Sequence, residues 1–272
     1  MARASFTHYI TDDSALGGME IERSLRFDDG NNAHLSKTFS SAGNRKVWTW
    51  SAWVRRGEFH GDADETMFHA YDGSSSNRAV IKFDSSRRLS VHMGGGGGSK
   101  GQARTSAVFR DVGAWYHIVC VGNYADSTAA DRVKMYVNGE LQTITFQVAF
   151  TDENGLFNSN IEHEIGIVAN NNSAFDGYMA DIHWIDGQAL DPSYFGFTDF
   201  QTGKWRPKRY EGTYGQNGFH LEFKDNSGVT ATTLGKDTSG NQHNFTPSNM
   251  SVSGWETNDS FIDTPTNTFP IL

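Results

Sequence analysis

Two glutamates separated by a single residue, Glu162 and Glu164, have the spacing in this sequence that most directly suggests catalysis. On a β-strand, side chains at positions i and i+2 point to the same face, so these carboxylates approach the separation of about 5 Å that a retaining glycosidase requires. The alternative is that they mark the solvated start of a strand and have no catalytic role. We favour this second interpretation.

A basic and aromatic segment, residues 204–210, stands out in an otherwise acidic chain. Aromatic faces stack on sugar rings, and arginine reaches acidic glycans or an acidic partner protein. The candidate ligand-binding residues are Trp205, Arg206, Arg209 and Tyr210. Packing of Trp205 against the domain, or a subunit contact, would explain the same segment, and we favour it over ligand binding.

The other residue types that could do chemistry are scattered. Five histidines lack the spacing of metal ligands; they are His60, His69, His92, His117 and His163. No order of Ser, His and Asp with a nucleophile elbow is visible. Cys120 is the sole cysteine, so no intrachain disulfide can form, and its place in an alternating apolar run predicts a core position.

Composition bounds the class of protein. The chain has 272 residues, 37% of them hydrophobic, with 19 Phe, 9 Tyr and 7 Trp, which is enough apolar surface for one large β domain. A net charge of −9 disfavours nucleic-acid binding. No stretch approaches the ~20 apolar residues of a membrane span, and the first residues lack the apolar core of a signal peptide.

The elements that must position these residues are short strands. Trp48, Trp50 and Ala52 alternate onto one face of a strand and Trp53 onto the other. Asn138-Gly139 is a strong hairpin signal, because both residues can adopt positive φ. About ten such strands, with polar turns and no long helices, predict a two-sheet antiparallel sandwich.

Smaller features set the boundaries of this sandwich. Asp191 followed by Pro192 predicts one short helical turn. We expect an N-terminal arm at 1–22, the sandwich at 23–257 and a C-terminal tail at 258–272. The alternating segment Phe219–Phe223 should return as a strand beside Leu25–Phe27 and close the sandwich.

Four ordered motifs identify the chain as similar to the concanavalin A-like, laminin-G-like jelly-roll family. Trp50–Gly57 resembles the family's W-S-x-W-V-K/R-x-G strand, Trp115–Val119 its W-Y-H-I/V-V strand and Met135–Gly139 its Y-V-N/D-G hairpin. The segment from Phe175 to Leu190 is similar to its F-D-G-Y-I-A-E-I…I-D-G-x-x-L ending. The resemblance implies an all-β, two-sheet antiparallel jelly roll.

The same resemblance bears on catalysis and on metals. Hydrolases of this fold typically show a Glu-x-Asp-x-x-Glu type of pattern, which His163 and Gly166 interrupt here, so a non-enzymatic member is implied. Laminin-G-like relatives often hold Ca²⁺ at the sandwich rim with Asp side chains. Asp62 and Asp64 are the candidates for such a site, although acidic residues are equally usual in a solvated turn. No other cofactor is expected.

Flanking segments resemble a subgroup abundant in tailed bacteriophages; these are Ser24–Phe27, Ser41–Arg45 and Lys236–Asn241. Together with the missing signal peptide, this implies a virion protein made in the host cytoplasm. We expect a tail fibre or another exposed particle component, with a lectin-like domain for adhesion to a host-surface glycan or protein. The alternatives are a capsid-decorating protein without a ligand and a glycan depolymerase.

The expected partners follow from that hypothesis. They are other virion proteins, further copies of the chain in a homo-oligomer, expected to be a trimer, and a host-surface glycan. Neither a nucleic acid nor a membrane is expected as a partner.

Overall fold

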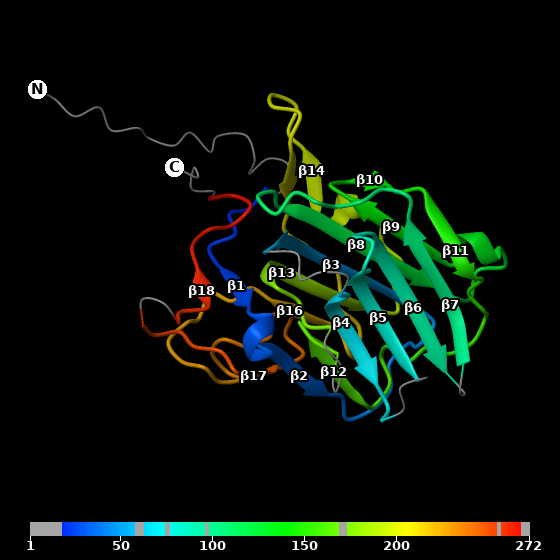
Figure 1. Cartoon of the computed structure of the whole chain (residues 1–272), viewed down its shortest axis with the longest axis horizontal. Helices are drawn as coiled ribbons and strands as arrows, with labels where there is room; N and C mark the ends of the chain where they lie inside the picture. Colours follow the sequence, from blue (N-terminus) through cyan, green and yellow to red (C-terminus); the bar gives the residue numbers. More distant parts are fainter. Residues whose placement is uncertain are drawn as a thin grey trace, which may run out of the picture.

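The computed structural model describes residues 18–57, 63–73, 77–95, 98–168, 173–254 and 257–267. These residues form two antiparallel sheets packed face to face, with three 3-10 turns and no α-helix (Figure 1). The turns are Asp29–Asn31, Ala129–Asp131 and Pro192–Tyr194. The predicted all-β sandwich is therefore confirmed, and the described residues contain no helix of the length and apolarity that a membrane crossing requires.

The first sheet has the order β10-β9-β8-β3-β13-β1-β18, and β16 also pairs with β13. Its strands are β1 (Ser24–Phe27), β3 (Val47–Arg56), β8 (Tyr116–Asn123), β9 (Val133–Val137), β10 (Glu140–Leu141), β13 (Gly177–Asp186), β16 (Phe219–Leu221) and β18 (Ser260–Phe261).

The second sheet has the order β11-β7-β6-β5-β4-β12-β2-β17. Its strands are β2 (His34–Thr38), β4 (Glu65–Tyr71), β5 (Arg78–Phe83), β6 (Leu89–Gly95), β7 (Gly98–Thr105), β11 (Ile144–Val148), β12 (Glu162–Ile165) and β17 (Thr246–Ser248). A separate ribbon of β14 (Gly196–Thr198) and β15 (Trp205–Pro207) projects beside the first sheet (Figure 1).

The core lies between the two sheets and follows the predicted alternation. Trp48, Trp50 and Ala52 are fully buried in it, whereas Trp53 packs on the opposite face of β3. Trp48 stacks on Trp184 of β13 with ring centroids 5.2 Å apart. Large aromatic side chains from both sheets thus fill the interior, as their number in the sequence suggested.

The outer face of the first sheet is covered by a further layer of chain. Val119 and Ile185 on this face pack against Phe195 and Tyr210, which follow β13 in the sequence. Trp53 packs in the same way against Ile21 and the half-buried Trp205. Side chains between this sheet and its cover are therefore largely removed from water.

Two predicted turns are confirmed. Asn138 and Gly139 adopt φ of 49° and 82° and join β9 to β10, a conformation that glycine adopts without steric cost. Asp191 caps the turn Pro192–Tyr194 by accepting a hydrogen bond of 2.8 Å from the backbone of Ser193.

The predicted partner of the closing strand is wrong. β16 pairs with β13, with Leu221 opposite Ile182, and does not pair with β1. The neighbours of β1 are β13 and β18 instead. Because β1 occupies only the first part of the edge of β13, the remaining part of that edge is free to pair with β16.

The described parts of the predicted arm and tail pack against the sandwich. Ile21 is buried, and its backbone N–H donates a hydrogen bond of 2.9 Å to Thr266 Oγ1. β18 lies within the predicted tail and pairs with β1. The two ends of the described chain therefore meet at one edge of the first sheet (Figure 1).

Candidate functional site

A β-bulge in the middle of β13 directs a carboxylate to the outer face of the first sheet. The register of β13 against β3 shifts between Ala180 and His183, and Asp181 adopts a φ of +51°. Aspartate is among the few residues other than glycine that adopt this conformation, and bulges re-aim side chains in this way. Ile182 faces the core, while Asp181 and His183 form a polar cluster on the other side.

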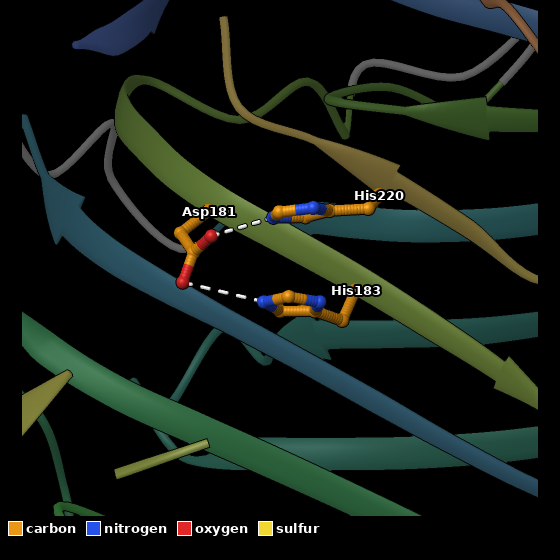
Figure 2. Close-up of side chains that lie close together, drawn as sticks. All are labelled: Asp181, His183 and His220. Carbon is orange, nitrogen blue, oxygen red and sulfur yellow. Dashed lines mark hydrogen bonds and ion pairs between the residues drawn. The ribbon is translucent and has the colours of Figure 1, made fainter. Parts of the chain in front are cut away.

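β16 adds a second imidazole. His220 lies directly opposite His183 in the strand register, and the two rings stack with centroids 4.0 Å apart and planes 11° from parallel. Asp181 lies between their ring nitrogens: Oδ1 is 2.7 Å from Nε2 of His220, and Oδ2 is 3.3 Å from Nε2 of His183 (Figure 2). Asp181 and His183 are 3% and 1% exposed, so this cluster is shielded from bulk water.

The charge states of the cluster follow from burial and contacts. Burial alone would raise the pKa of Asp181, but His183 and His220 together outweigh it and hold the pKa of this carboxyl below its usual range. Burial, with His220 alongside, lowers the pKa of His183. At neutral pH Asp181 is therefore a carboxylate and His183 a neutral imidazole.

The hydrogen-bond directions then follow by elimination. A carboxylate only accepts, so Nε2 of His220, 2.7 Å away, donates to it. Nε2 of His183 lies 3.3 Å from Asp181 without hydrogen-bond geometry, but the negative charge favours a hydrogen on this atom and leaves Nδ1 of His183 as the acceptor. Nδ1 of His183 lies 2.9 Å from the hydroxyl of Tyr214, and Nδ1 of His220 lies 2.9 Å from that of Thr238. The Tyr214 hydroxyl consequently donates to His183, and the Thr238 hydroxyl donates to Nδ1 or to the backbone oxygen of His220, which lies 3.3 Å away.

This cluster does not fit a metal ion as it stands. Among the described residues it is the one group of His, Cys, Asp or Glu close enough to share an ion, with ligand atoms within 4.8 Å of one another. Ring nitrogens bind zinc at about 2.0–2.1 Å through a lone pair in the ring plane. Because the two rings are stacked nearly parallel, an ion in the plane of one ring lies outside the plane of the other.

A cavity of about 190 Å³ opens above the two imidazoles. Its lining includes His183, Arg209, Tyr214, His220, Glu222 and Thr238. The ring of Tyr214 is 14° from parallel to His183 and 15° from parallel to His220, at 6.0 Å from each. The cavity thus has an aromatic wall of three parallel rings bordered by polar groups, and we call it the ring-stack pocket.

The structure divides the four predicted ligand-binding residues. Arg209 and Tyr210 line the ring-stack pocket. Trp205 lies in β15 with its indole packed near Trp53, as the favoured packing interpretation expected, and Arg206 lies in the same ribbon, 4.0 Å from Asp199. Whether any of the four binds a ligand stays a prediction.

Asp181, His183 and His220 are not among the site residues predicted from the sequence. A signal for the histidines existed, because His183 lies between Ile182 and Trp184, and His220 also has apolar neighbours in its strand. A polar residue that alternates with core residues points to the opposite face of the sheet. Nothing in the sequence gave the bulge or the pairing of the two strands.

A Ser-His nucleophile on the same face is excluded by its proton positions. Nε2 of His117 is 2.9 Å from Ser51 Oγ, and Nδ1 is 2.9 Å from Nε1 of Trp205. The indole is only a donor, so Nδ1 accepts and the hydrogen on Nε2 points to Ser51. His117 therefore cannot take a proton from Ser51, and burial lowers the pKa of this histidine to about 3.

The two candidate catalytic glutamates lie on one face of β12, as their spacing predicted. Glu162 is exposed, which agrees with a solvated strand start. Glu164 is 6% exposed and lies 3.1 Å from Nδ1 of His69, so the interpretation as a solvated strand start is wrong for Glu164. His163 points the other way and packs in the core against Phe39.

The structure describes one of the two predicted calcium ligands. Asp62 lies outside the described residues. Asp64 forms an ion pair with Lys82 and accepts a hydrogen bond of 3.0 Å from the backbone of Ser85, and the neighbouring Glu65 is paired with Arg56. Asp64 would have to leave Lys82 to bind Ca²⁺, and the calcium site stays a prediction.

Comparison with known proteins places the fold. Residues 28–193 match the family model described as the concanavalin A-like lectin/glucanases superfamily. No curated protein matches the chain. A structure named a "putative carbohydrate binding protein", from Bacteroides ovatus ATCC 8483, is similar with a TM-score of 0.56 at 16% identity, over 84% of this chain and 58% of that one.

Two other solved structures are similar over parts of this chain. The heptameric SAP-like pentraxin of Limulus polyphemus matches with a TM-score of 0.46 and 15% identity, over 64% of this chain and 81% of that one. Domains LG4-5 of the mouse laminin alpha1 chain match with a TM-score of 0.43 and 15% identity, over 64% of this chain and 44% of that one. The match to the Bacteroides ovatus protein, in contrast, spans little more than half the length of that protein.

Proposed function

Because the chain belongs to the concanavalin A-like lectin/glucanase superfamily, we propose that it is a non-enzymatic glycan-binding domain whose ring-stack pocket holds a sugar. The fold supports glycan binding as the general class of function, and the ring-stack pocket is the cavity in which we propose that the sugar lies. Sites for small molecules combine an apolar or aromatic wall with a few convergent polar groups. The ring-stack pocket has both.

The observation that carries this proposal is the pairing of the three-ring wall with hydroxyl oxygens. A sugar ring offers C–H groups on its faces and hydroxyls around its rim. The hydroxyl of Tyr214 donates to His183, so its oxygen has a lone pair left to accept a hydrogen bond from a sugar hydroxyl. At about 190 Å³ the cavity is smaller than the roughly 300–1,000 Å³ of sites for drug-sized ligands, which suits one sugar residue.

The arrangement of carboxylates supports binding rather than hydrolysis. Glycosidases use a pair of carboxyl groups on either side of the scissile bond. Of the described residues that line the pocket, Glu222 alone supplies a carboxylate, and it lies 3.1 Å from Lys224 Nζ. Asp181 lies at the edge of the stacked rings, next to Nε2 of His183 and of His220 (Figure 2).

We extend the proposal to a bacteriophage particle, on which the domain would act in a tail fibre or another exposed component. The support is the resemblance of the flanking segments to proteins of tailed phages. One of these segments, Lys236–Asn241, also builds the pocket, because Asp237 accepts a hydrogen bond of 2.9 Å from the backbone of His220. The homo-oligomer, the virion partners and the host-surface glycan belong to the same proposal.

A glycan array probed with the purified chain tests the proposal, followed by titration of the strongest ligand. Tyr214→Phe keeps the ring and removes the hydroxyl, so affinity should fall about tenfold, equivalent to about 1.4 kcal/mol. Tyr194→Phe is the matched control, because Tyr194 is 47% exposed and lies outside the pocket. An array without binders, or equal affinities for Tyr214→Phe and the wild type, would contradict the proposal.

A further inference from the structure

Apart from Arg209, the polar groups that face the ring-stack pocket are hydrogen-bond acceptors. The hydrogen of the Tyr214 hydroxyl is directed to Nδ1 of His183. That of Thr238 is directed to Nδ1 or to the backbone oxygen of His220, at 2.9 and 3.3 Å. Both hydroxyl oxygens can therefore only accept a hydrogen bond from a ligand, and the carboxylate of Glu222 also only accepts.

The charges around the pocket act in the same direction. Asp181 lies at the edge of the imidazoles with a buried negative charge, and Glu222 lines the pocket while paired with Lys224. Lys224 does not add a free positive charge, because its Nζ lies 3.1 Å from Glu222 and 3.5 Å from Glu22. Arg209 is the one cation of the described lining, and it is exposed.

From this geometry we infer that the ring-stack pocket selects uncharged sugars that donate hydroxyl hydrogens and rejects sugars that carry a carboxylate. This rests on the proposed function and names its ligand class. A carboxylate has no hydrogen to give to Tyr214, Thr238 or Glu222, so burying it there leaves acceptors facing acceptors. Such unpaired polar contacts reject a wrong ligand more strongly than shape alone.

Asp181 is the positioning residue of this selection. It acts through the imidazoles: its negative charge favours a hydrogen on the Nε2 atoms that face it, and so directs the Tyr214 hydroxyl toward Nδ1 of His183. In Asp181→Asn, the amide presents one oxygen and one NH₂ group. Where the NH₂ group faces His183, this imidazole carries its hydrogen on Nδ1, and the Tyr214 hydroxyl turns its own hydrogen toward the pocket.

Acidification should reverse the same polarity. Protonated His183 carries hydrogens on both nitrogens, so Tyr214 would have to accept from this ring and donate into the pocket. The titratable and charged groups that face His183 are Asp181 in β13, His220 and Glu222 on and after β16, His117 in β8, and Arg209, Tyr210 and Tyr214 in the covering layer.

The test is an array of matched neutral and uronic-acid glycans, probed at pH 7 with the wild type, Asp181→Asn and Lys204→Gln. Lys204 lies in the exposed loop of the ribbon and serves as the control. We expect the wild type and the control to bind neutral glycans at least tenfold more tightly than acidic ones. We expect Asp181→Asn to reduce that ratio at least threefold while remaining folded by circular dichroism.

The outcomes separate this inference from the proposed function. Strong binding of acidic glycans that is lost in Arg209→Gln would overturn the selection and leave a glycan-binding pocket in place. An array without any binder would overturn both. If Asp181→Asn fails to fold, Thr238→Val removes one acceptor at an exposed position and should weaken neutral glycans selectively; an unchanged ratio there would also overturn the inference.

Discussion

Two histidine sites lie on the same outer face of the first sheet and differ in what covers them. His117 is enclosed by Ser51 on one side and by the indole of Trp205 on the other. His183 is likewise buried, neutral and hydrogen bonded, but a cavity opens above it and the stacked His220. Burial and a shifted pKa are therefore common to both sites. The difference is that hydroxyl oxygens face an open space only at the second one.

Acidification should lower the free energy of unfolding more than the substitutions below, because it acts on buried neutral histidines in both sheets. Burial lowers the pKa of His117 and of His163 to about 3. An unfolded histidine titrates near 6.5, so below that pH the unfolded chain binds more protons and stability falls as the pH falls. Two such residues lower the free energy of unfolding by about 4 kcal/mol between pH 7 and pH 5.

Urea unfolding at pH 7, 6 and 5 measures this loss. The control is His117→Gln, in which the dependence should weaken by about 1.4 kcal/mol per pH unit below pH 6.5. A free energy of unfolding that stays constant from pH 7 to pH 5 would show that these histidines are not held neutral in the fold.

The second prediction concerns the site of His117, which Trp205 covers, and distinguishes it from the ring-stack pocket. Trp205→Ala removes the indole that packs over His117 and leaves Nδ1 of this histidine without its donor. A cavity and an unpaired buried nitrogen together should lower the free energy of unfolding by about 3 kcal/mol. Glycan affinity of the folded variant should stay close to that of the wild type, and a large loss of affinity with little change in stability would reverse the assigned roles.

The smallest loss of stability is expected for a substitution in the ring-stack pocket. Thr238→Val removes the hydroxyl that donates to His220, but Thr238 is exposed and water can replace it. The free energy of unfolding should therefore change by less than about 1 kcal/mol. Thermal denaturation monitored by circular dichroism provides the check, and a loss as large as that of Trp205→Ala would mean that the second site is as closed as the first.

Much of the fold follows from local residue patterns. The alternation of Trp48, Trp50 and Ala52 against Trp53 gave the correct faces of β3, and Asn138-Gly139 gave the correct hairpin. Patterns of this kind depend on the two-residue period of a strand and on positive φ, both of which are local properties.

The candidate site depends on properties that are not local. Asp181 and His183 come together with His220 only because β16 pairs with the part of β13 that β1 leaves free. The sequence alone indicated a return beside β1, since apolar alternation specifies a buried strand but not its neighbour. The bulge at Asp181 is likewise invisible, because one extra residue in a strand leaves no compositional mark.

The basic and aromatic segment shows the same limit at shorter range. Trp205 and Arg206 lie in the ribbon, whereas Arg209 and Tyr210 follow its last strand and reach the ring-stack pocket. Residues that are adjacent in sequence were grouped as one candidate site, although the chain leaves the ribbon after Pro207. The shared basic and aromatic composition identified the region but could not show which of its residues line the pocket.

The most direct test of the central claim is to follow the histidine side-chain nitrogens by NMR while an array-selected glycan is titrated into the protein. The signals of His183 and His220 should shift with the fraction bound, and those of His117 should stay in place. Shifts confined to His69 and His92, which belong to the second sheet, would place the ligand elsewhere and contradict the account.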